Sequence, residues 1–329
     1  MTAVPTGAST PSAGSANAGS STAGPASAGP VNALSDLAPV QVRAEVLAIK
    51  RIGSYFAITL VAPGVAERFR PGQFVTTAVG GAPGEPTAML LRRAFSVYRA
   101  SARGTYGSTI EIVVAAHGPG THWLTRRQRH DQVLITGPLG RPFALPRTSV
   151  GQLPAHTVLV GGGYGAAPLF ALADSLRERG CRVDMIIGAA SQDRLFGALE
   201  AKRASTAVAI TTEDGSIGQT GRVTDALPAM LERYGGDVIY ACGPMPMLAA
   251  VAGVAAKYGI ASQCLVEEAM ACGIGVCMTC VLPVIGNDGV TRMVRSCVEG
   301  PAFPGDRVRW NDVGSIPDDC WGAPTGGHR

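Results

Sequence analysis

The chain has 329 residues, which is room for about two domains. Its 43 glycines and 23 prolines make up about a fifth of the chain, against roughly 12% in an average protein. Charged residues reach only 16% and the formal net charge is +4, which argues against a nucleic-acid-binding protein with a clustered basic face. The hydrophobic fraction of 46% excludes a globally disordered chain. We expect no membrane span either, because glycines and a proline interrupt the most apolar stretch, residues 158–173.

The N-terminal segment differs in composition from the rest of the chain. Residues 1–35 contain no charged side chain, and 29 of the 35 are Ala, Ser, Gly, Thr or Pro. Such a segment cannot bury enough apolar surface to offset the entropy of the chain, so we expect residues 1–37 to be disordered. It has neither the basic start and apolar core of a signal peptide nor the arginines of a transit peptide. We therefore expect a cytoplasmic protein.

Residues 38–150 have the pattern of a small β-barrel. Glycine and proline breaks separate six β-branched or alternating runs, which are residues 40–52, 55–61, 73–79, 94–98, 109–115 and 132–136. Six closely spaced strands favour an antiparallel barrel. One helix, over residues 121–129, is predicted to interrupt them.

Residues 151–266 alternate between strand-like and helical runs. The predicted strands are residues 157–160, 182–187, 207–211, 237–241 and 263–266, and the predicted helices are residues 167–179, 193–203, 222–234 and 245–258. This alternation is typical of βαβ units and a parallel sheet. Residues 267–312 form an irregular, cysteine-bearing segment, followed by a C-terminal tail, residues 313–329. The sequence thus predicts a multi-domain fold: an antiparallel β-barrel, an α/β parallel-sheet domain and a small cysteine-bearing domain.

Four of the eight cysteines lie close together in the sequence: Cys272, Cys277, Cys280 and Cys297. The spacing C-x4-C-x2-C followed by a distant cysteine is the plant-type spacing of a [2Fe–2S] cluster. Glycines at positions 273 and 275 suit a loop that wraps sulfides, because glycine permits unusual dihedral angles and a close approach of backbone N–H groups. A four-cysteine zinc site is the alternative, although its usual form has two C-x2-C pairs and only one is present here.

A glycine-rich run from Gly161 to Pro168 follows a predicted strand and opens a predicted helix. This context suits a pyrophosphate held by N–H groups at the start of a helix. The run is not the standard Rossmann fingerprint, because Ile187-Gly-Ala-Ala-Ser191 stands where the next strand should end in an acidic residue. A tight turn without a ligand would explain the same glycines. Residues 188–193 contain no basic residue for a 2′-phosphate and Arg194 is the only nearby candidate, so we expect NAD rather than NADP.

Three shorter motifs are weak evidence when each is taken alone. Arg93-Ala-Phe95-Ser96 falls on a predicted barrel strand, and Gly118-Pro-Gly120-Thr121 falls at a predicted helix start. An arginine can pair with a diphosphate, and a helix N-terminus favours negative charge. Cys242, which Gly243 and Pro244 follow, ends the fourth predicted strand of the α/β segment, the edge where open sheets bind ligands. A buried core thiol is the alternative for Cys242.

In their order along the chain, these motifs resemble the ferredoxin–NAD(P) reductase superfamily. A closer resemblance, to one family within this superfamily, rests on the run from Glu268 to Cys280 together with residues 212–216 and 221–225. The chain is similar there to the electron-transfer subunits of class B dihydroorotate dehydrogenases. The resemblance covers roughly residues 39–310.

The resemblance implies three bound groups: FAD in the barrel domain, NAD in the α/β domain and a [2Fe–2S] cluster on the four cysteines. It implies that FAD is bound by Arg93, Ala94, Phe95, Ser96, Val113, Val114, Ala115, Gly120 and Thr121. It implies that NAD is bound by Gly161, Gly163, Gly165, Pro168, Cys242, Gly243 and Pro244. Cys242 would be the catalytic residue, beside the reacting ring.

The implied partner is an FMN-containing catalytic subunit that oxidises dihydroorotate to orotate in pyrimidine biosynthesis. The resemblance implies a hetero-oligomer of the two subunits, a heterotetramer, in which electrons run from FMN through [2Fe–2S] and FAD to NAD+. This chain alone would not act on dihydroorotate. One alternative is a reductase with the same three cofactor sites that serves a ferredoxin or a sulfite-reducing subunit. Another is a flavin-binding module whose cysteines hold a structural zinc ion.

Overall fold

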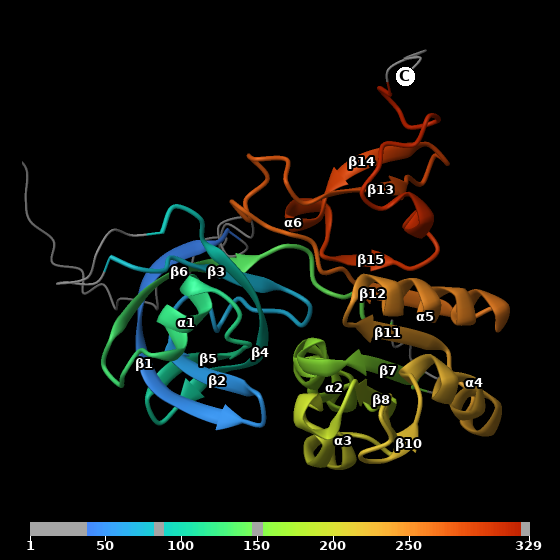
Figure 1. Cartoon of the computed structure of the whole chain (residues 1–329), viewed down its shortest axis with the longest axis horizontal. Helices are drawn as coiled ribbons and strands as arrows, with labels where there is room; N and C mark the ends of the chain where they lie inside the picture. The colour runs from blue at the N-terminus through green and yellow to red at the C-terminus, as the bar shows by residue number, and fades with distance from the viewer. Residues whose placement is uncertain (1–37, 82–88, 147–153, 324–329) are drawn as a thin grey trace, which may run out of the picture. The chain divides into compact units, whose positions relative to one another are not determined.

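The computed structural model describes residues 38–81, 89–146 and 154–323 (Figure 1). The tail predicted to be disordered, residues 1–37, lies outside the described residues, as do residues 324–329 of the predicted C-terminal tail. Among the described residues, no helix is both long and apolar enough to cross a membrane.

Six strands close into a barrel in the order β1-β2-β5-β4-β3-β6, and all neighbouring strands are antiparallel. They are β1 (Val40–Ile52), β2 (Tyr55–Val61), β3 (Phe74–Thr77), β4 (Arg93–Gly104), β5 (Gly107–Val114) and β6 (Gln132–Leu139). β1 pairs with β6 through its first half and with β2 through its second, and a β-bulge between Val46 and Ala48 separates the two halves. A bulge bends a strand, so one long strand serves both sides of the closed barrel.

Several barrel elements differ in their bounds from the prediction: β3 is shorter than the predicted residues 73–79, β6 extends beyond residue 136, and β5 begins at Gly107 and ends at Val114. The largest differences are in β4 and in the helix that follows β5. β4 runs on to Gly104 instead of ending at residue 98, because it forms a long hairpin with β5. The helix α1 (Pro119–Thr125) begins and ends earlier than the predicted residues 121–129. It stops because the carboxylate of Asp131 accepts the N–H of Gln128 at 2.8 Å, which closes a turn instead of a further helical turn.

The second sheet has seven strands in the order β10-β9-β8-β7-β11-β12-β15. They are β7 (His156–Gly162), β8 (Arg182–Ala189), β9 (Ala207–Thr212), β10 (Gln219–Thr220), β11 (Val238–Cys242), β12 (Ala261–Leu265) and β15 (Ala302–Pro304). The neighbours are parallel except for β12 and β15, which are antiparallel. The sheet is therefore mixed rather than purely parallel.

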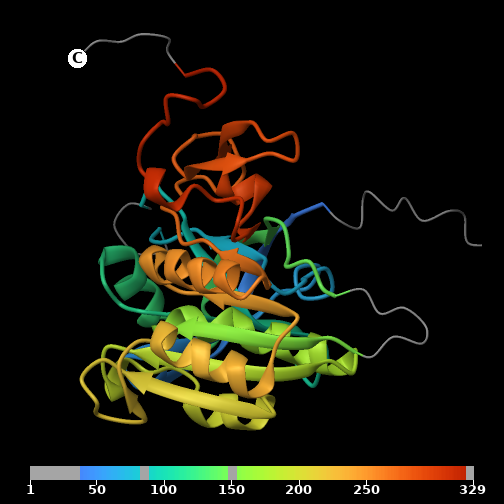
Figure 2. The same cartoon turned by 90° about the vertical axis from the view of Figure 1, so that its right-hand side faces the viewer.

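Helices cover both faces of this sheet, and successive residues of its strands face opposite sides. Leu159 packs in the core that contains α2 (Ala167–Glu178) and α3 (Ala198–Ala204), whereas Val158 and Val160 pack in the core that contains α4 (Val223–Tyr234) and α5 (Met245–Lys257). Figure 2 shows α4 and α5 lying across the strands on one face. Burial on both faces explains why the central strands are almost entirely apolar.

The predicted helix over residues 193–203 is two pieces, a 3₁₀ turn at Gln192–Arg194 and α3. Gly197 separates them with a φ of +73°, and a Cβ there would lie 2.4 Å from the ring of Phe170. The segment from Glu267, predicted to be irregular, is also more regular than expected. It contains the antiparallel hairpin β13 (Val281–Ile285) and β14 (Thr291–Arg295), the short helix α6 (Ser296–Glu299), and β15.

Aromatic and charged side chains join the barrel to the parallel sheet. The Tyr98 ring lies 5.8 Å from that of Phe170 and 5.3 Å from that of Phe196, both edge to face. The Tyr98 hydroxyl donates to Glu200, and Arg99 pairs with the same carboxylate. Because Tyr98 and Arg99 belong to β4 while the other three residues belong to the sheet domain, this contact fixes β4 against α2 and α3.

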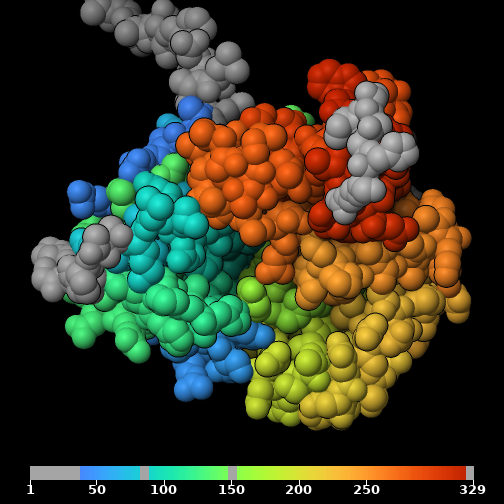
Figure 3. Space-filling model, turned by 45° about the horizontal axis from the view of Figure 1, so that its top comes forward, coloured from blue at the N-terminus to red at the C-terminus, as the bar shows by residue number. Residues whose placement is uncertain are grey.

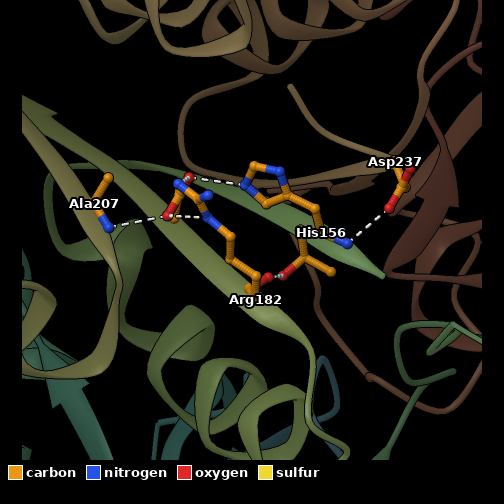
Figure 4. A network of polar contacts seen from close by, with 6 residues as sticks. His156, Arg182, Ala207 and Asp237 are labelled. Carbon is orange, nitrogen blue, oxygen red and sulfur yellow. Dashed lines mark hydrogen bonds and ion pairs between the residues drawn. The ribbon is translucent and has the colours of Figure 1, made fainter. Parts of the chain in front are cut away.

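A buried carboxylate joins the amino ends of the parallel strands (Figure 4). Asp184 on β8 is fully buried. Its carboxylate lies 2.8 Å from Nε2 of His156 and accepts hydrogen bonds from Arg182 at 3.0 Å and from the N–H of Ala207 at 2.9 Å. Asp237 accepts the N–H of His156 at 2.7 Å. The starts of four strands are thereby tied together, at the edge opposite the glycine-rich turn.

Candidate cofactor sites

A cavity of about 280 Å³ lies between the barrel and the carboxyl ends of the parallel strands. From the barrel and α1 it is lined by Phe74, Arg93, Ala94, Phe95, Ser96, Val113, Ala115, His117 and Thr121. From the other side it is lined by Tyr164, Pro168, Cys242, Gly243, Glu267, Glu268 and Met270, among others. We call it the barrel cavity. Seven of the nine residues assigned to FAD by resemblance line its wall.

The other two predicted FAD residues lie behind this wall. Val114 points into the barrel core, where it is fully buried, because side chains alternate along a strand and its neighbours Val113 and Ala115 face the cavity. Gly120 lies under the guanidinium of Arg93, and a Cβ at position 120 would lie 2.8 Å from Nε of that arginine. The absence of a side chain at position 120 therefore lets Arg93 lie across the start of α1.

The turn that begins α1 is held by the hydroxyl of Thr121. This hydroxyl accepts the N–H groups of His117 and Gly118 at 3.0 and 3.1 Å and donates to the carbonyl of Gly118. The turn thus brings a fixed backbone and the positive charge of Arg93 to one end of the barrel cavity. A wall that carries a positive charge and has no side chain at position 120 fits the diphosphate of a dinucleotide.

A second cavity, of about 420 Å³, lies over the glycine-rich turn. We call it the glycine-loop cavity. Its wall includes Tyr55, Gly162, Gly163, Tyr164, Gly165, Ala189, Ala190, Arg194, Thr211, Glu213, Arg222, Pro244, Met247 and Glu267. The turn passes through the 3₁₀ segment η2 (Gly163–Ala166) before α2 begins.

The glycines of this turn are required by close packing. Gly163 has a φ of +55°, and a Cβ at Gly165 would lie 2.8 Å from the Cα of Gly243. Gly161 packs against Ala166, where a Cβ would lie 2.5 Å from that of Ala166. Among the predicted NAD residues, Gly163 and Pro244 line the glycine-loop cavity, and Pro168, Cys242 and Gly243 line the barrel cavity. Gly165 lines both cavities, and Gly161 is in the lining of neither.

Three residues, Tyr164, Gly165 and Glu267, line both cavities and mark their junction. The ring of Tyr164 lies 5.2 Å from that of Tyr55. Burial raises the pKa of the Cys242 thiol well above its usual value, and the nearby carboxylate of Glu267 raises it further. Cys242 is therefore a neutral thiol beside the junction at physiological pH.

Two of the four cysteines of the C-terminal segment pack against the barrel. Cys280 and Cys297 are buried and pack with Phe74 on β3 and Leu139 on β6. The N–H groups of Ile274 and Val276 point to Sγ of Cys272 at 3.4 and 3.3 Å. Figure 3 shows the surface of this segment, in orange, next to the teal surface of the barrel.

The cysteine sulfurs fall into two interacting pairs. Hydrogen bonds from Thr279 and then from Cys272 lower the pKa of Cys277 to about 6. Burial and then the neighbouring Cys280 raise the pKa of Cys297. Across the described ranges, no three His, Cys, Asp or Glu side chains are arranged around one metal position. Two pairs of sulfurs fit a two-iron cluster, in which each iron takes two cysteine ligands.

Several wall residues were not assigned from the sequence, among them the aromatic or charged Tyr55, Tyr164, Glu213, Arg222 and Glu267. Tyr164 lies inside the glycine-rich run and Glu267 directly precedes the motif that begins at Glu268, so both had a local signal. Glu213 follows the third parallel strand, whereas the acidic residue was sought after the second.

Two family models match the chain. The iron-sulfur cluster binding domain of dihydroorotate dehydrogenase B matches residues 267–309, and the oxidoreductase NAD-binding domain matches residues 159–253. The chain is also similar to a solved structure, that of the NADH-dependent reduced ferredoxin-NADP oxidoreductase, which concerns flavin-based electron bifurcation. The TM-score is 0.69 and the sequence identity is 28%. That match covers 83% of this chain and 91% of the other.

Two curated relatives are the electron transfer subunits of dihydroorotate dehydrogenase B (NAD(+)) from Geobacillus thermodenitrificans and Desulforamulus reducens. The first is 38% identical over 77% of this chain and 92% of the relative, and the second is 32% identical over 81% and 97%. The matches cover nearly the full length of both relatives. The chain belongs to the family of dihydroorotate dehydrogenase B electron transfer subunits.

Proposed function

We propose that this subunit carries electrons from an FMN-containing catalytic subunit, which oxidises dihydroorotate to orotate in pyrimidine biosynthesis, through [2Fe–2S] and FAD to NAD+. One observation carries the proposal: the three sites adjoin in that order. Phe74 packs against Cys280 and Cys297 and also lines the barrel cavity. Tyr164 and Glu267 then line both the barrel cavity and the glycine-loop cavity.

We assign FAD to the barrel cavity, NAD to the glycine-loop cavity and the cluster to the four cysteines. Flavin, when bound, exchanges a hydride with nicotinamide and single electrons with an iron–sulfur cluster. Arg93 supplies the charge that pairs with the diphosphate of FAD. Cys242, only 5% exposed and neutral, excludes water where the nicotinamide meets the flavin without adding a negative charge.

The charges of the glycine-loop cavity favour NAD over NADP. Glu213 places a carboxylate in the wall at the end of β9, and Ala189 and Ala190 end β8 without charge. A 2′-phosphate beside Glu213 would be repelled, whereas the hydroxyls of a ribose can donate to it. Arg194 and Arg222 in the same wall are available to the pyrophosphate.

The surface around the cysteines supports a protein partner. Ile274, Val276 and Met278 lie between the cluster cysteines and are 55%, 75% and 52% exposed. A group of exposed apolar side chains is typical of a protein interface. We propose that the catalytic subunit covers this surface in a heterotetramer. We further propose a cytoplasmic location, since none of the eight cysteines, all within the described residues, is joined in a disulfide, as expected in a reducing compartment.

Co-expression with a candidate catalytic subunit tests the proposal. The purified complex should reduce NAD+ when dihydroorotate is added, and the isolated subunit should not. The isolated subunit should still contain FAD and iron and should oxidise NADH with an artificial electron acceptor. A complex that reduces ferredoxin or sulfite but not NAD+ would contradict the proposed partner. A yellow protein with zinc and no iron would contradict the cluster.

A further inference from the structure

Two buried hydroxyl groups next to the cysteines have no hydrogen-bond partner among the described residues. They are Oγ1 of Thr76, whose residue is 2% exposed, and Oγ of Ser296, whose residue is fully buried. Buried side-chain hydroxyls in native proteins nearly always have a partner. The pair therefore points to an acceptor that the protein holds when it is loaded.

Thr76 faces the cysteine loop from the barrel. On β3, Val75 packs into the barrel core, and the hydroxyl of Thr77 donates to the carbonyl of Arg93 at 3.4 Å. Phe74 and Thr76 face the other way, because side chains alternate along a strand. A Cβ on Gly273 would lie 2.6 Å from Cγ2 of Thr76, so the methyl group of Thr76 touches the loop one residue after the first cluster cysteine, and the hydroxyl is carried on the same Cβ.

Ser296 lies between the other two cluster cysteines. Its N–H donates to the carbonyl of Cys280 at 2.8 Å, and Cys297 is the next residue in the chain. Both of these cysteines are buried, like Ser296 itself. Thr76 and Ser296 thus come from the barrel and from the C-terminal segment to opposite ends of the cysteine motif.

We propose that the hydroxyls of Thr76 and Ser296 donate hydrogen bonds to sulfur atoms of the [2Fe–2S] cluster, either sulfide or cysteine sulfur, and thereby raise its reduction potential. The inference rests on the proposed cluster site. Reduction adds one negative charge to the cluster, and a hydrogen-bond donor stabilises the more negative state more strongly. Hydrogen bonds to sulfur are among the main determinants of cluster potential. Thr76 and Ser296 are therefore positioning residues that tune the cluster without ligating iron.

Thr76→Val and Ser296→Ala test this in the full chain loaded with its cofactors. The cluster potential is measured by redox titration monitored by electron paramagnetic resonance. Each variant should have a more negative cluster potential than the unmodified protein, and the double variant should be more negative than either. The FAD potential and the iron and sulfide content should stay unchanged. Thr76→Ser, which keeps the hydroxyl, should restore the original potential.

Thr77→Val is the matched control. It removes a hydroxyl from the neighbouring residue of the same strand, on the opposite face and bonded to Arg93, so the cluster potential should not move. Unchanged potentials in fully loaded Thr76→Val and Ser296→Ala would overturn the inference and leave the proposed function intact. Absence of iron from the unmodified protein would instead overturn the proposed cluster.

A second measurement keeps the inference testable if Thr76→Val does not assemble its cluster. In the unmodified protein, reconstituting the cluster in D₂O should shift the Fe–S stretching bands of the resonance Raman spectrum. Thr76→Ser keeps its hydroxyl and should show the full shift, whereas Ser296→Ala has lost one hydroxyl and should show a smaller shift. A Ser296→Ala spectrum with the full shift would overturn the role of Ser296, and an unmodified spectrum without any shift would overturn the whole inference.

Discussion

The hydroxyl of Tyr164 donates a 3.2 Å hydrogen bond to Oε1 of Glu267, at the junction of the two cavities. Tyr164 comes from the glycine-rich turn after β7, and Glu267 comes from the chain just after β12. Burial and the nearby carboxylate raise the pKa of Tyr164 to about 12, so the tyrosine stays neutral. The pair thus keeps one negative charge, that of Glu267, where nicotinamide and flavin would meet.

Removal of this charge should slow hydride transfer from NADH. Nicotinamide gains positive charge as it gives up a hydride, and a carboxylate in a fixed position stabilises that charge in the transition state. Glu267→Gln should therefore lower the rate of FAD reduction by NADH roughly tenfold, because the carboxylate is partly exposed to water. The measurement is stopped-flow reduction of the flavin at saturating NADH.

The chain offers a matched control for this change. Glu232 accepts a 2.8 Å hydrogen bond from the hydroxyl of Tyr258 on the exposed surface, so Glu232→Gln alters a similar pair that lines neither cavity. It should reduce at the unmodified rate. An equal rate for Glu267→Gln would show that the junction carboxylate does not act on the hydride step.

Gly120→Ala should weaken FAD binding by displacing Arg93. The new Cβ would lie 2.8 Å from Nε of Arg93, so the guanidinium must move away from the start of α1. Loss of a charge-assisted hydrogen bond is worth about 1.5–3 kcal/mol, so we expect the Kd for FAD to rise about 10- to 100-fold. Titration of the flavin-free protein with FAD, followed by flavin fluorescence, measures it. Gly253→Ala is the control, because its Cβ meets open space, and it should bind FAD normally.

An unchanged Kd for Gly120→Ala would contradict the assignment of Arg93 to the FAD site.

The elements that could be predicted from the sequence are those with a strong local pattern. The six barrel strands and the parallel strands are apolar runs bounded by glycine and proline, and their periodicity reports burial directly. The cysteine spacing likewise sufficed for the cluster, because an iron–sulfur group needs ligands from one loop at short separations. Alternation along β5 already indicates that the side chains of Val113 and Ala115 face the cavity and that of Val114 faces the barrel core.

The rest depends on contacts between distant segments. β15 has only three residues, and it is a strand because it pairs with β12, nearly forty residues earlier in the chain. Three residues are too few to show the alternation of apolar and polar side chains that identifies a strand in the sequence. Glu267 and Tyr164 meet only after the parallel sheet brings the ends of β7 and β12 to the same edge. Gly197 divides the predicted helix because of Phe170, a tertiary neighbour.

Asp184→Ala should destabilise the parallel sheet strongly. The substitution leaves His156, Arg182 and the N–H of Ala207 without the buried carboxylate that they share (Figure 4). Removing one partner of a buried ion pair typically costs about 3–5 kcal/mol. Equilibrium unfolding in urea, followed by far-ultraviolet circular dichroism, gives the loss in free energy of unfolding. Asp174→Ala removes a half-exposed carboxylate 3.9 Å from Arg99 and should change stability by less than about 1 kcal/mol. Equal losses for the two variants would contradict a structural role for the Asp184 network.

Glu213→Gln should relax the preference for NADH over NADPH. The variant keeps the size of the side chain and removes the charge that would oppose a 2′-phosphate, so the ratio of kcat/KM values for NADH and NADPH should fall about 5- to 20-fold. Most of the change should appear as a lower KM for NADPH. Steady-state reduction of an artificial acceptor by each nucleotide measures the ratio. A fall caused by slower NADH oxidation alone would mean that Glu213 binds the ribose without excluding phosphate.

Cys280→Ser should separate the two halves of the electron path. The thiolate of Cys280 is a proposed cluster ligand, and serine is a poor substitute, so iron content should drop sharply. The barrel cavity lies on the other side of Phe74, so FAD should remain bound and NADH should still reduce it. Electron exchange with the catalytic subunit should then fall at least 100-fold while FAD reduction by NADH stays within about twofold of normal. Cys320→Ser, which alters a buried thiol outside the cysteine motif, should keep full iron content and full exchange. Exchange that survived the loss of iron in Cys280→Ser would mean that electrons reach FAD without passing through the cluster.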